Sequence, residues 1–160
     1  MPETWDAQIS PDGKHLALGC SPTGVRAICL YQLDSDARPR LIAPPEDGKI
    51  EGLRWASPGY LIYFVSVYET IGTSSGLRDY TFRRMASYDV KSGNSEILMR
   101  REKFRVDTAR IDSMLVDDDE HILTVINRPN IVTQDKTMKA NLRTGKSRRG
   151  LNVKDTGWII

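Results

Sequence analysis

The sequence predicts an all-β protein built from repeated four-stranded antiparallel units, and three observations support this fold class. Apolar residues do not recur with the helical period over any window of about 11 residues. Runs of about 5 to 8 strand-forming residues instead alternate with turns rich in Pro, Gly, Asp, Asn and Ser. The same order of strands and turns returns after about 50 residues, which is typical of β-propeller blades. We therefore expect a partial β-propeller of about three four-stranded blades.

The first unit is expected to span residues 7–46, with a tight turn at Ser10-Pro11-Asp12-Gly13. Proline sets φ at the second position of such a turn, Asp hydrogen-bonds the nearby backbone, and Gly13 supplies a positive φ. One apolar run before this turn and three runs after it complete a four-stranded unit. The three later strands are predicted at residues 15–18, 25–33 and 40–42.

The second unit is expected at residues 47–104 and the third at 105–152, and residues 153–160 are expected to open a fourth. In the second unit we predict a longer loop between the second strand and the third, running to about Arg78. Strands are predicted at 50–55, 60–67, 82–90 and 96–99 in the second unit, and at 109–116, 121–126 and 138–142 in the third.

The repeat is visible in the spacing of equivalent positions. The third strands of the units end at Leu33, Val90 and Leu142, so the period is about 50 residues. Trp55 and Trp158 are about two such periods apart. A β-sandwich also has many short strands, but it has no reason to repeat its turn chemistry at a fixed period. Trp55 ends a strand with alternating apolar positions and is predicted to be a core residue.

The composition is that of a globular domain, with 39% hydrophobic residues, 28% charged residues and a net charge of +2. The longest apolar run, residues 60–65, is much shorter than the ~20 residues of a membrane span, so no membrane partner is expected. The N-terminus has no basic stretch leading into an apolar one. We expect a cytoplasmic protein if Met1 is the natural start, and a periplasmic or secreted one if an upstream signal precedes it.

Two cysteines, Cys20 and Cys29, lie close together in the sequence. The favoured interpretation is a pair of small buried thiols in a reducing compartment. The alternative is a cross-strand disulfide in an oxidising compartment. Because the sequence has no Cys-x-x-Cys motif and no Cys/His cluster, a structural zinc site is not expected. No other cofactor is expected either.

One motif resembles a catalytic nucleophile. Residues 72–76 read Gly-Thr-Ser-Ser-Gly and match G-x-S-x-G, in which Ser74 would be the nucleophile. That motif requires a strand before it, a helix after it, and Asp and His downstream. The residues that follow read as loop and strand, and His121 is the only downstream histidine. We therefore interpret the motif as a loop of small residues.

The other polar groups also give no catalytic, metal or cofactor site. The acidic runs 117–120 and 34–36 lack the alternating ligands and central glycine of a calcium loop, so both are predicted to be turns. His15 and His121 are each the first residue of the second strand in their unit, after an acidic turn. Neither has a partner for acid–base or metal chemistry in the sequence, so no role is assigned to them.

The segment from Lys136 to Lys154 contains seven basic residues and no acid, which would suit an anionic partner. Strand alternation would, however, send these side chains to different faces, and few aromatics accompany them for base stacking. The favoured interpretation is a solvated hairpin, and nucleic acid is not expected as a partner. The residues concerned are Lys136, Lys139, Arg143, Lys146, Arg148, Arg149 and Lys154.

The segment around the turn at residues 10–13 resembles a known repeat. Residues 9–17, Ile-Ser-Pro-Asp-Gly-Lys-His-Leu-Ala, are similar to the S-P-D-G repeat of bacterial WD40-like propellers. Such propellers occur in TolB and at the N-terminus of prolyl-oligopeptidase-family serine peptidases. Residues 25–34, 49–55 and 141–146, with Gly157-Trp158, resemble the acylaminoacyl-peptidase-like members of that family.

This resemblance implies a function without catalytic residues in the chain. In that family the Ser-Asp-His triad lies in a C-terminal α/β-hydrolase domain, which this sequence lacks, and the propeller has about seven blades. We expect the non-catalytic propeller portion of a serine peptidase, restricting which peptide substrates reach the hydrolase domain. The alternative is a TolB-like protein-interaction propeller without enzymatic activity. In either case an incomplete propeller is expected to self-associate.

Overall fold

The described residues form twelve β-strands in three antiparallel sheets and contain no helix. A computed structural model describes residues 5–44, 48–100, 110–115, 117–126 and 136–149. The prediction of an all-β protein with antiparallel four-stranded units is confirmed. The expected start of a fourth unit at 153–160, with Trp158, lies outside the described residues. No described segment forms a helix long and apolar enough to cross a membrane.

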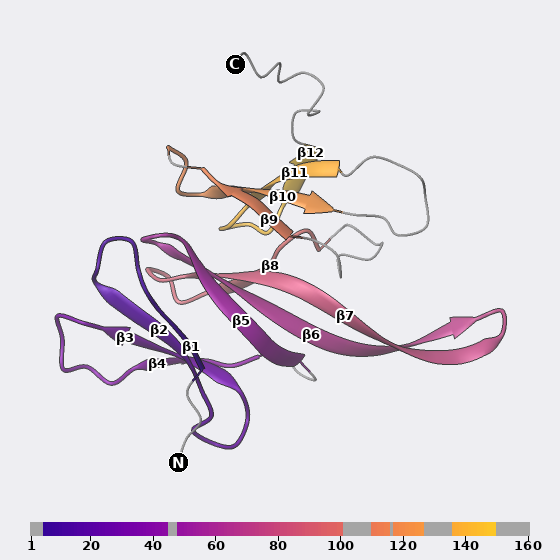
Figure 1. Cartoon of the computed structure of the whole chain (residues 1–160), viewed down its shortest axis with the longest axis horizontal. Coiled ribbons are helices and arrows are strands. Elements are labelled where there is room, and N and C mark those ends of the chain that lie inside the picture. The colour runs from indigo at the N-terminus through magenta and orange to yellow at the C-terminus, as the bar shows by residue number, and fades with distance from the viewer. Residues whose placement is uncertain (1–4, 45–47, 101–109, 116, 127–135, 150–160) are drawn as a thin grey trace.

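Each sheet is a meander in which strands that follow one another in sequence are neighbours in space (Figure 1). The first sheet contains β1 (Trp5–Ile9), β2 (His15–Cys20), β3 (Ala27–Gln32) and β4 (Arg40–Ile42). The second contains β5 (Gly48–Ser57), β6 (Tyr60–Thr73), β7 (Gly76–Asp89) and β8 (Ser95–Ile97). The third contains β9 (Arg110–Met114), β10 (His121–Ile126), β11 (Lys136–Asn141) and β12 (Ser147–Arg149).

The turn between β1 and β2 has the predicted chemistry. Gly13 has a φ of 72°, and its amide donates to the Ser10 carbonyl at 2.9 Å. The Ser10 hydroxyl donates to the Asp12 carboxylate at 2.6 Å and accepts from the His15 amide at 2.9 Å. The Ser10 hydroxyl, together with the Lys14 amide, lowers the pKa of Asp12. The turn is therefore closed by side chains as well as by its backbone.

The first and second sheets pack face to face over one apolar core. Trp55 is buried there, as predicted, and its indole Nε1 donates to the Gln8 carbonyl at 3.0 Å. The Gln8 side chain in turn donates to the Leu53 carbonyl at 3.0 Å, which ties β1 to β5. The buried members of this core are Ala17, Ile28, Leu30, Ile42, Ile50, Leu53, Trp55, Leu61, Tyr63, Val65, Ala86, Tyr88 and Val90.

The opposite face of the second sheet packs against the third sheet, so the second sheet lies between the other two (Figure 1). Two hydroxyls link these sheets, with Ser57 donating to the Asp119 carbonyl and Ser87 to the Leu142 carbonyl. The buried members of this second core are Tyr60, Ile62, Met85, Leu98, Met99, Ile122, Met138, Ala140 and Leu142.

The prediction of free cysteines is wrong. Cys20 and Cys29 form a disulfide, with Cα atoms 5.9 Å apart. Cys20 pairs with Ala27 and Cys29 with Leu18 across β2 and β3, so both side chains lie on the same face of the first sheet. That register brings the two Cα atoms within the range that a disulfide spans.

The prediction of a loop before Arg78 is also wrong. The β6–β7 ladder continues without a break from Tyr60↔Asp89 to Thr73↔Gly76. The two strands extend beyond the rest of the sheet as a long two-stranded ribbon (Figure 1). The outer part of this ribbon lacks the apolar alternation of a half-buried strand, and for that reason the sequence pattern did not reveal it.

Candidate functional site

Ser74 lies at the tip of the long hairpin, where Ser74 and Ser75 form the two-residue connection between β6 and β7. The Thr73 hydroxyl closes this turn by donating to the Gly76 carbonyl at 2.7 Å, and Gly76 has a φ of 114°. A strand follows the motif where a nucleophile elbow requires a helix. The G-x-S-x-G sequence is therefore a hairpin turn in this protein.

A polar cluster on the third sheet is the most developed site among the described residues. We call Asp118, His121, Lys139 and Asn141 the His121 cluster. Asp118 contacts His121 Nδ1 at 2.7 Å through one carboxylate oxygen and Lys139 Nζ at 2.6 Å through the other. Asn141 Nδ2 lies 3.1 Å from His121 Nε2. The cluster joins the turn before β10 to β11, because His121 and Asn141 are directly paired across these strands.

The hydrogen bonds of Asn141 determine the tautomer of His121. Asn141 Oδ1 accepts from the Arg143 amide, the Thr144 amide and the Thr144 hydroxyl, so the other end of the side chain is the amide NH₂. That NH₂ group donates to His121 Nε2, and Nδ1 therefore carries the proton and donates to Asp118. Both ring nitrogens are occupied, and neither is available to a substrate hydroxyl.

The electrostatics of the cluster are dominated by one carboxylate. Lys139 and, second, His121 lower the pKa of Asp118 from 3.8 to about 2. Hydrogen bonds from cationic or polar donors stabilise the ionised carboxylate, which is why the pKa falls. Asp118 consequently stays charged through the physiological range and keeps Lys139 and His121 in place.

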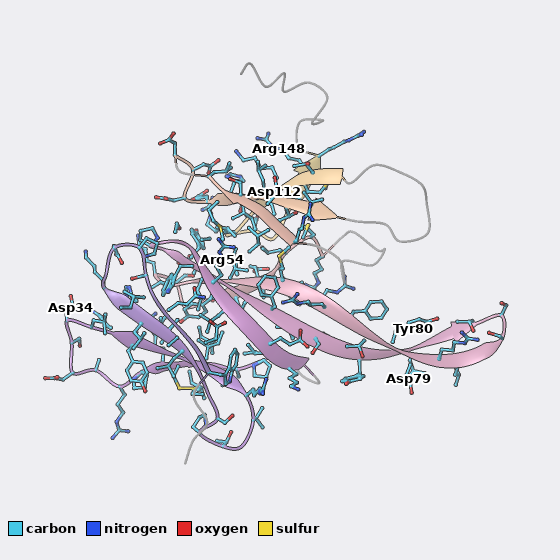
Figure 2. The ribbon with its side chains drawn as sticks, viewed as in Figure 1. Asp34, Arg54, Asp79, Tyr80, Asp112 and Arg148 are labelled. Carbon is cyan, nitrogen blue, oxygen red and sulfur yellow. A yellow bond between two sulfur atoms is a disulfide. The ribbon has the colours of Figure 1, made fainter. Side chains whose placement is uncertain are left out.

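Basic side chains surround the cluster on the same side. A hollow of about 390 Å³ is lined by His121, Lys139, Asn141, Lys146, Ser147 and Arg148. Lys139 pairs directly with Arg148 across β11 and β12, so these two lie on one face of the sheet (Figure 2 labels Arg148). The expectation that alternation disperses the basic residues is wrong for Lys139, Lys146 and Arg148. Arg149 lies on the opposite face, as expected from alternation, because it pairs directly with Met138, whose side chain is buried.

This arrangement suits the binding of a small anion better than nucleophilic catalysis. Lys146 and Arg148 have no acidic partner within the described part of the chain, and Asn141 and His121 add polar groups to the hollow. Ser147 borders the same hollow, but it pairs with Ala140, whose side chain is buried on the opposite face of the sheet. Asp118, His121 and Ser147 therefore do not form a relay for activating a hydroxyl.

The remaining candidates are structural. His15 lies beside Trp55, with ring centroids 6.2 Å apart, and its Nδ1 has no hydrogen-bond partner in the described residues. The backbone carbonyl of Asp119 accepts from Ser57, while Asp34 lies exposed at the surface (Figure 2). Within the described ranges, no group of three or more His, Cys, Asp or Glu side chains could hold a metal ion.

The sequence contained a weak signal for the His121 cluster. Asp118 lies three residues before His121, which is the first residue of a predicted strand. This spacing places the two side chains on one side of a tight turn. The contributions of Lys139 and Asn141 depend on the register of β10 with β11, which the sequence does not reveal. No protein-family model matches the chain, and no curated protein matches it significantly.

Proposed function

We propose that this chain is part of a β-propeller and that its role is the non-catalytic control of access to an α/β-hydrolase domain in a prolyl-oligopeptidase-like serine peptidase. One observation carries the propeller part of this proposal: three consecutive four-stranded meanders pack face to face. A propeller is built by repeating that arrangement around an axis. The peptidase part rests on the resemblance of residues 9–17 and 25–34 to propellers of that family.

The chemistry of the described residues fits a non-catalytic role. Ser74 lies in a hairpin turn, and both ring nitrogens of His121 are engaged within the protein. A propeller acts on a neighbouring hydrolase domain by covering its active site, so that short or unfolded peptides enter and folded proteins do not. The Cys20–Cys29 disulfide favours an oxidising compartment for this protein.

The test compares the present chain with the full-length product of its gene. We expect the full product to hydrolyse a short peptide ester and to cleave short peptides much faster than a folded protein. The isolated 160-residue chain should give no hydrolysis. Activity of the isolated chain that Ser74→Ala abolishes would contradict the proposal. A full product without a hydrolase domain and without activity would favour the TolB-like interaction propeller instead.

A further inference from the structure

A hollow of about 290 Å³, which we call the Arg84 pocket, lies where the first sheet meets the second. Strands β6, β7 and β8 of the second sheet line most of it, and the segment that follows β4 of the first sheet closes one side. Its volume is at the small end of the range for ligand pockets. The pocket is therefore suited to one apolar side chain and not to a large ligand.

The floor of the Arg84 pocket is mostly apolar. Tyr63, Ala86 and Ile97 are directly paired across β6, β7 and β8 and line the pocket together. Val65 pairs with Arg84 in the next row of the same face. Alternation along the strands directs these side chains to the face that packs toward the first sheet. An apolar group that enters the pocket is removed from water there, which favours its binding.

Arg84 supplies a positive charge to this pocket. Its side chain is half-buried, and its guanidinium lies 5.7 Å from the Phe82 ring. No carboxylate among the described residues forms an ion pair with it. Glu96 also borders the pocket, but it pairs with Ser87, whose hydroxyl donates to the third sheet, so the Glu96 side chain points to the opposite face. A half-buried guanidinium without a carboxylate partner favours the binding of an anion.

The backbone beside Arg84 can also accept a ligand. The Leu98 amide donates to the Met85 carbonyl, so the backbone groups of Met85 point away from β6. Residues two apart in a strand direct their backbone groups to the same side, so Arg83 presents its N–H and C=O at the same edge of β7. β8 pairs with β7 only from Ala86 onward, and no described strand covers the edge at Arg83. A short peptide main chain can therefore hydrogen-bond there.

We propose that the Arg84 pocket binds the C-terminal residue of a peptide. The apolar side chain of that residue packs against Val65, Ala86 and Ile97, and its carboxylate accepts hydrogen bonds from the Arg84 guanidinium. An arginine fork fits a carboxylate through two parallel hydrogen bonds. The preceding peptide group lies at the edge of β7 beside Arg83. The inference is independent of the proposed function, because it uses only the contacts between the first two sheets.

An NMR titration of the 160-residue chain tests the class of ligand. The probe is the dipeptide acetyl-Ala-Leu with a free carboxylate, and the control is the same dipeptide with a C-terminal amide. We expect the acid to bind with a Kd of about 1 mM or tighter and to shift the amide signals of Arg84, Ala86 and Ile97. The amide should bind at least about tenfold more weakly. Equal binding of the two dipeptides, or no binding of the acid at about 10 mM, would refute the proposal.

Hexanoate distinguishes a peptide from a free fatty acid as the source of the carboxylate. It has the same charge and an apolar chain, but it has no peptide group to hydrogen-bond the edge of β7. We expect hexanoate to bind at least about fivefold more weakly than the acid dipeptide, because those hydrogen bonds are missing. Hexanoate that binds as tightly as the dipeptide would overturn the assignment to a peptide.

Two substitutions on one face of β7 test the role of Arg84. Arg84→Gln removes the charge, and we expect it to weaken binding of the acid dipeptide at least about tenfold. Arg78→Gln is the matched control, because Arg78 is exposed on the same face of β7 but does not line the pocket. It should bind the dipeptide as the parent does. Equal affinities of the two variants would contradict the proposed role of Arg84.

A third variant tests the pocket without changing its charge. Ala43 is exposed and lines the pocket, so Ala43→Phe should fill the hollow and prevent binding. Thermal melts show whether each variant is folded, and we expect Ala43→Phe to melt as the parent does. Unchanged binding of the dipeptide by a folded Ala43→Phe would overturn the placement of the ligand in this pocket.

Discussion

At the scale of the residue, Trp55 shows how one side chain joins two sheets. Its ring is buried in the core between the first and second sheets, and its Nε1 is satisfied by the Gln8 carbonyl of β1. A buried aromatic with a satisfied polar group contributes apolar area without leaving an unpaired donor. Trp55 therefore stabilises both the second sheet and its contact with the first.

We expect Trp55→Ala to lower the free energy of unfolding by about 3–5 kcal/mol, which is the usual range for truncating a buried aromatic. Trp55→Phe is the matched control, since it keeps most of the apolar volume and removes only the hydrogen bond to Gln8. Urea denaturation measures both. A loss below about 1 kcal/mol for Trp55→Ala would show that the side chain does not contribute to the core.

Two glycines allow the effect of backbone conformation on stability to be distinguished from the effect of close packing. Gly13 and Gly145 both have positive φ, of 72° and 67°. A Cβ on Gly13 would meet no atom within 4 Å, whereas a Cβ on Gly145 would lie 2.5 Å from the Ile97 carbonyl oxygen. Gly145 is thus required both for its conformation and for the close approach of the β11–β12 turn to the second sheet.

We expect Gly13→Ala to destabilise the protein by about 1–2 kcal/mol, because alanine is disfavoured in the left-handed region. Gly145→Ala should cost at least about 1 kcal/mol more, since its Cβ clashes with backbone that cannot easily move. Paired thermal and urea melts give both values. Equal losses for the two variants would mean that the turn shifts to accept the methyl group.

At the scale of the element, the His121 cluster connects β10, β11 and the turn before them. Asp118 is the centre of this connection, because it accepts from Lys139 and His121 at once. Its pKa is lowered to about 2 in the folded protein, against 3.8 for an unperturbed group. The ionised carboxylate therefore favours the folded state above about pH 4, and this contribution is lost as the pH falls toward about 2.

The corresponding prediction concerns Asp118→Asn. The parent should be more stable than this variant near pH 7, and the difference should shrink below about pH 4 as Asp118 is protonated. Thermal melts of both proteins from pH 7 to pH 2 measure the difference. Asp117→Asn is the matched control, because Asp117 is an exposed neighbour outside the cluster. A difference that stays constant down to pH 2 would contradict the proposed linkage.

At the scale of the whole molecule, the outer face of the first sheet is apolar. Leu18, Cys29 and Leu41 are directly paired across β2, β3 and β4, so they share this face, and Leu41 is 52% exposed. Within the described residues no sheet packs on it. In the proposed propeller, a neighbouring blade would cover this face, and exposed apolar faces of this kind recruit other chains.

We therefore expect the isolated chain to associate at high concentration, and Leu41→Asp to reduce this association. Leu33→Asp is the matched control, since Leu33 is 50% exposed but follows β3 and lies outside the paired strands. Light scattering over a concentration series measures the size. A monodisperse 18.1 kDa monomer at all concentrations would contradict this prediction.

The sequence by itself determined the features that depend on neighbouring residues. Local periodicity or local turn chemistry predicts the all-β fold class, the turn at residues 10–13, the positive φ of Gly13 and the burial of Trp55. These preferences act over a few residues, so a single sequence contains enough information to predict them.

Only the tertiary structure decided the features that depend on register between strands. The pairing of Cys20 with Cys29, the length of the β6–β7 hairpin and the contacts of Lys139 and Asn141 in the His121 cluster each require knowing which residues lie opposite one another. A shift of one residue would place every side chain of a strand on the other face of its sheet. Register is set by packing between distant segments, and the local pattern of residues therefore leaves it open.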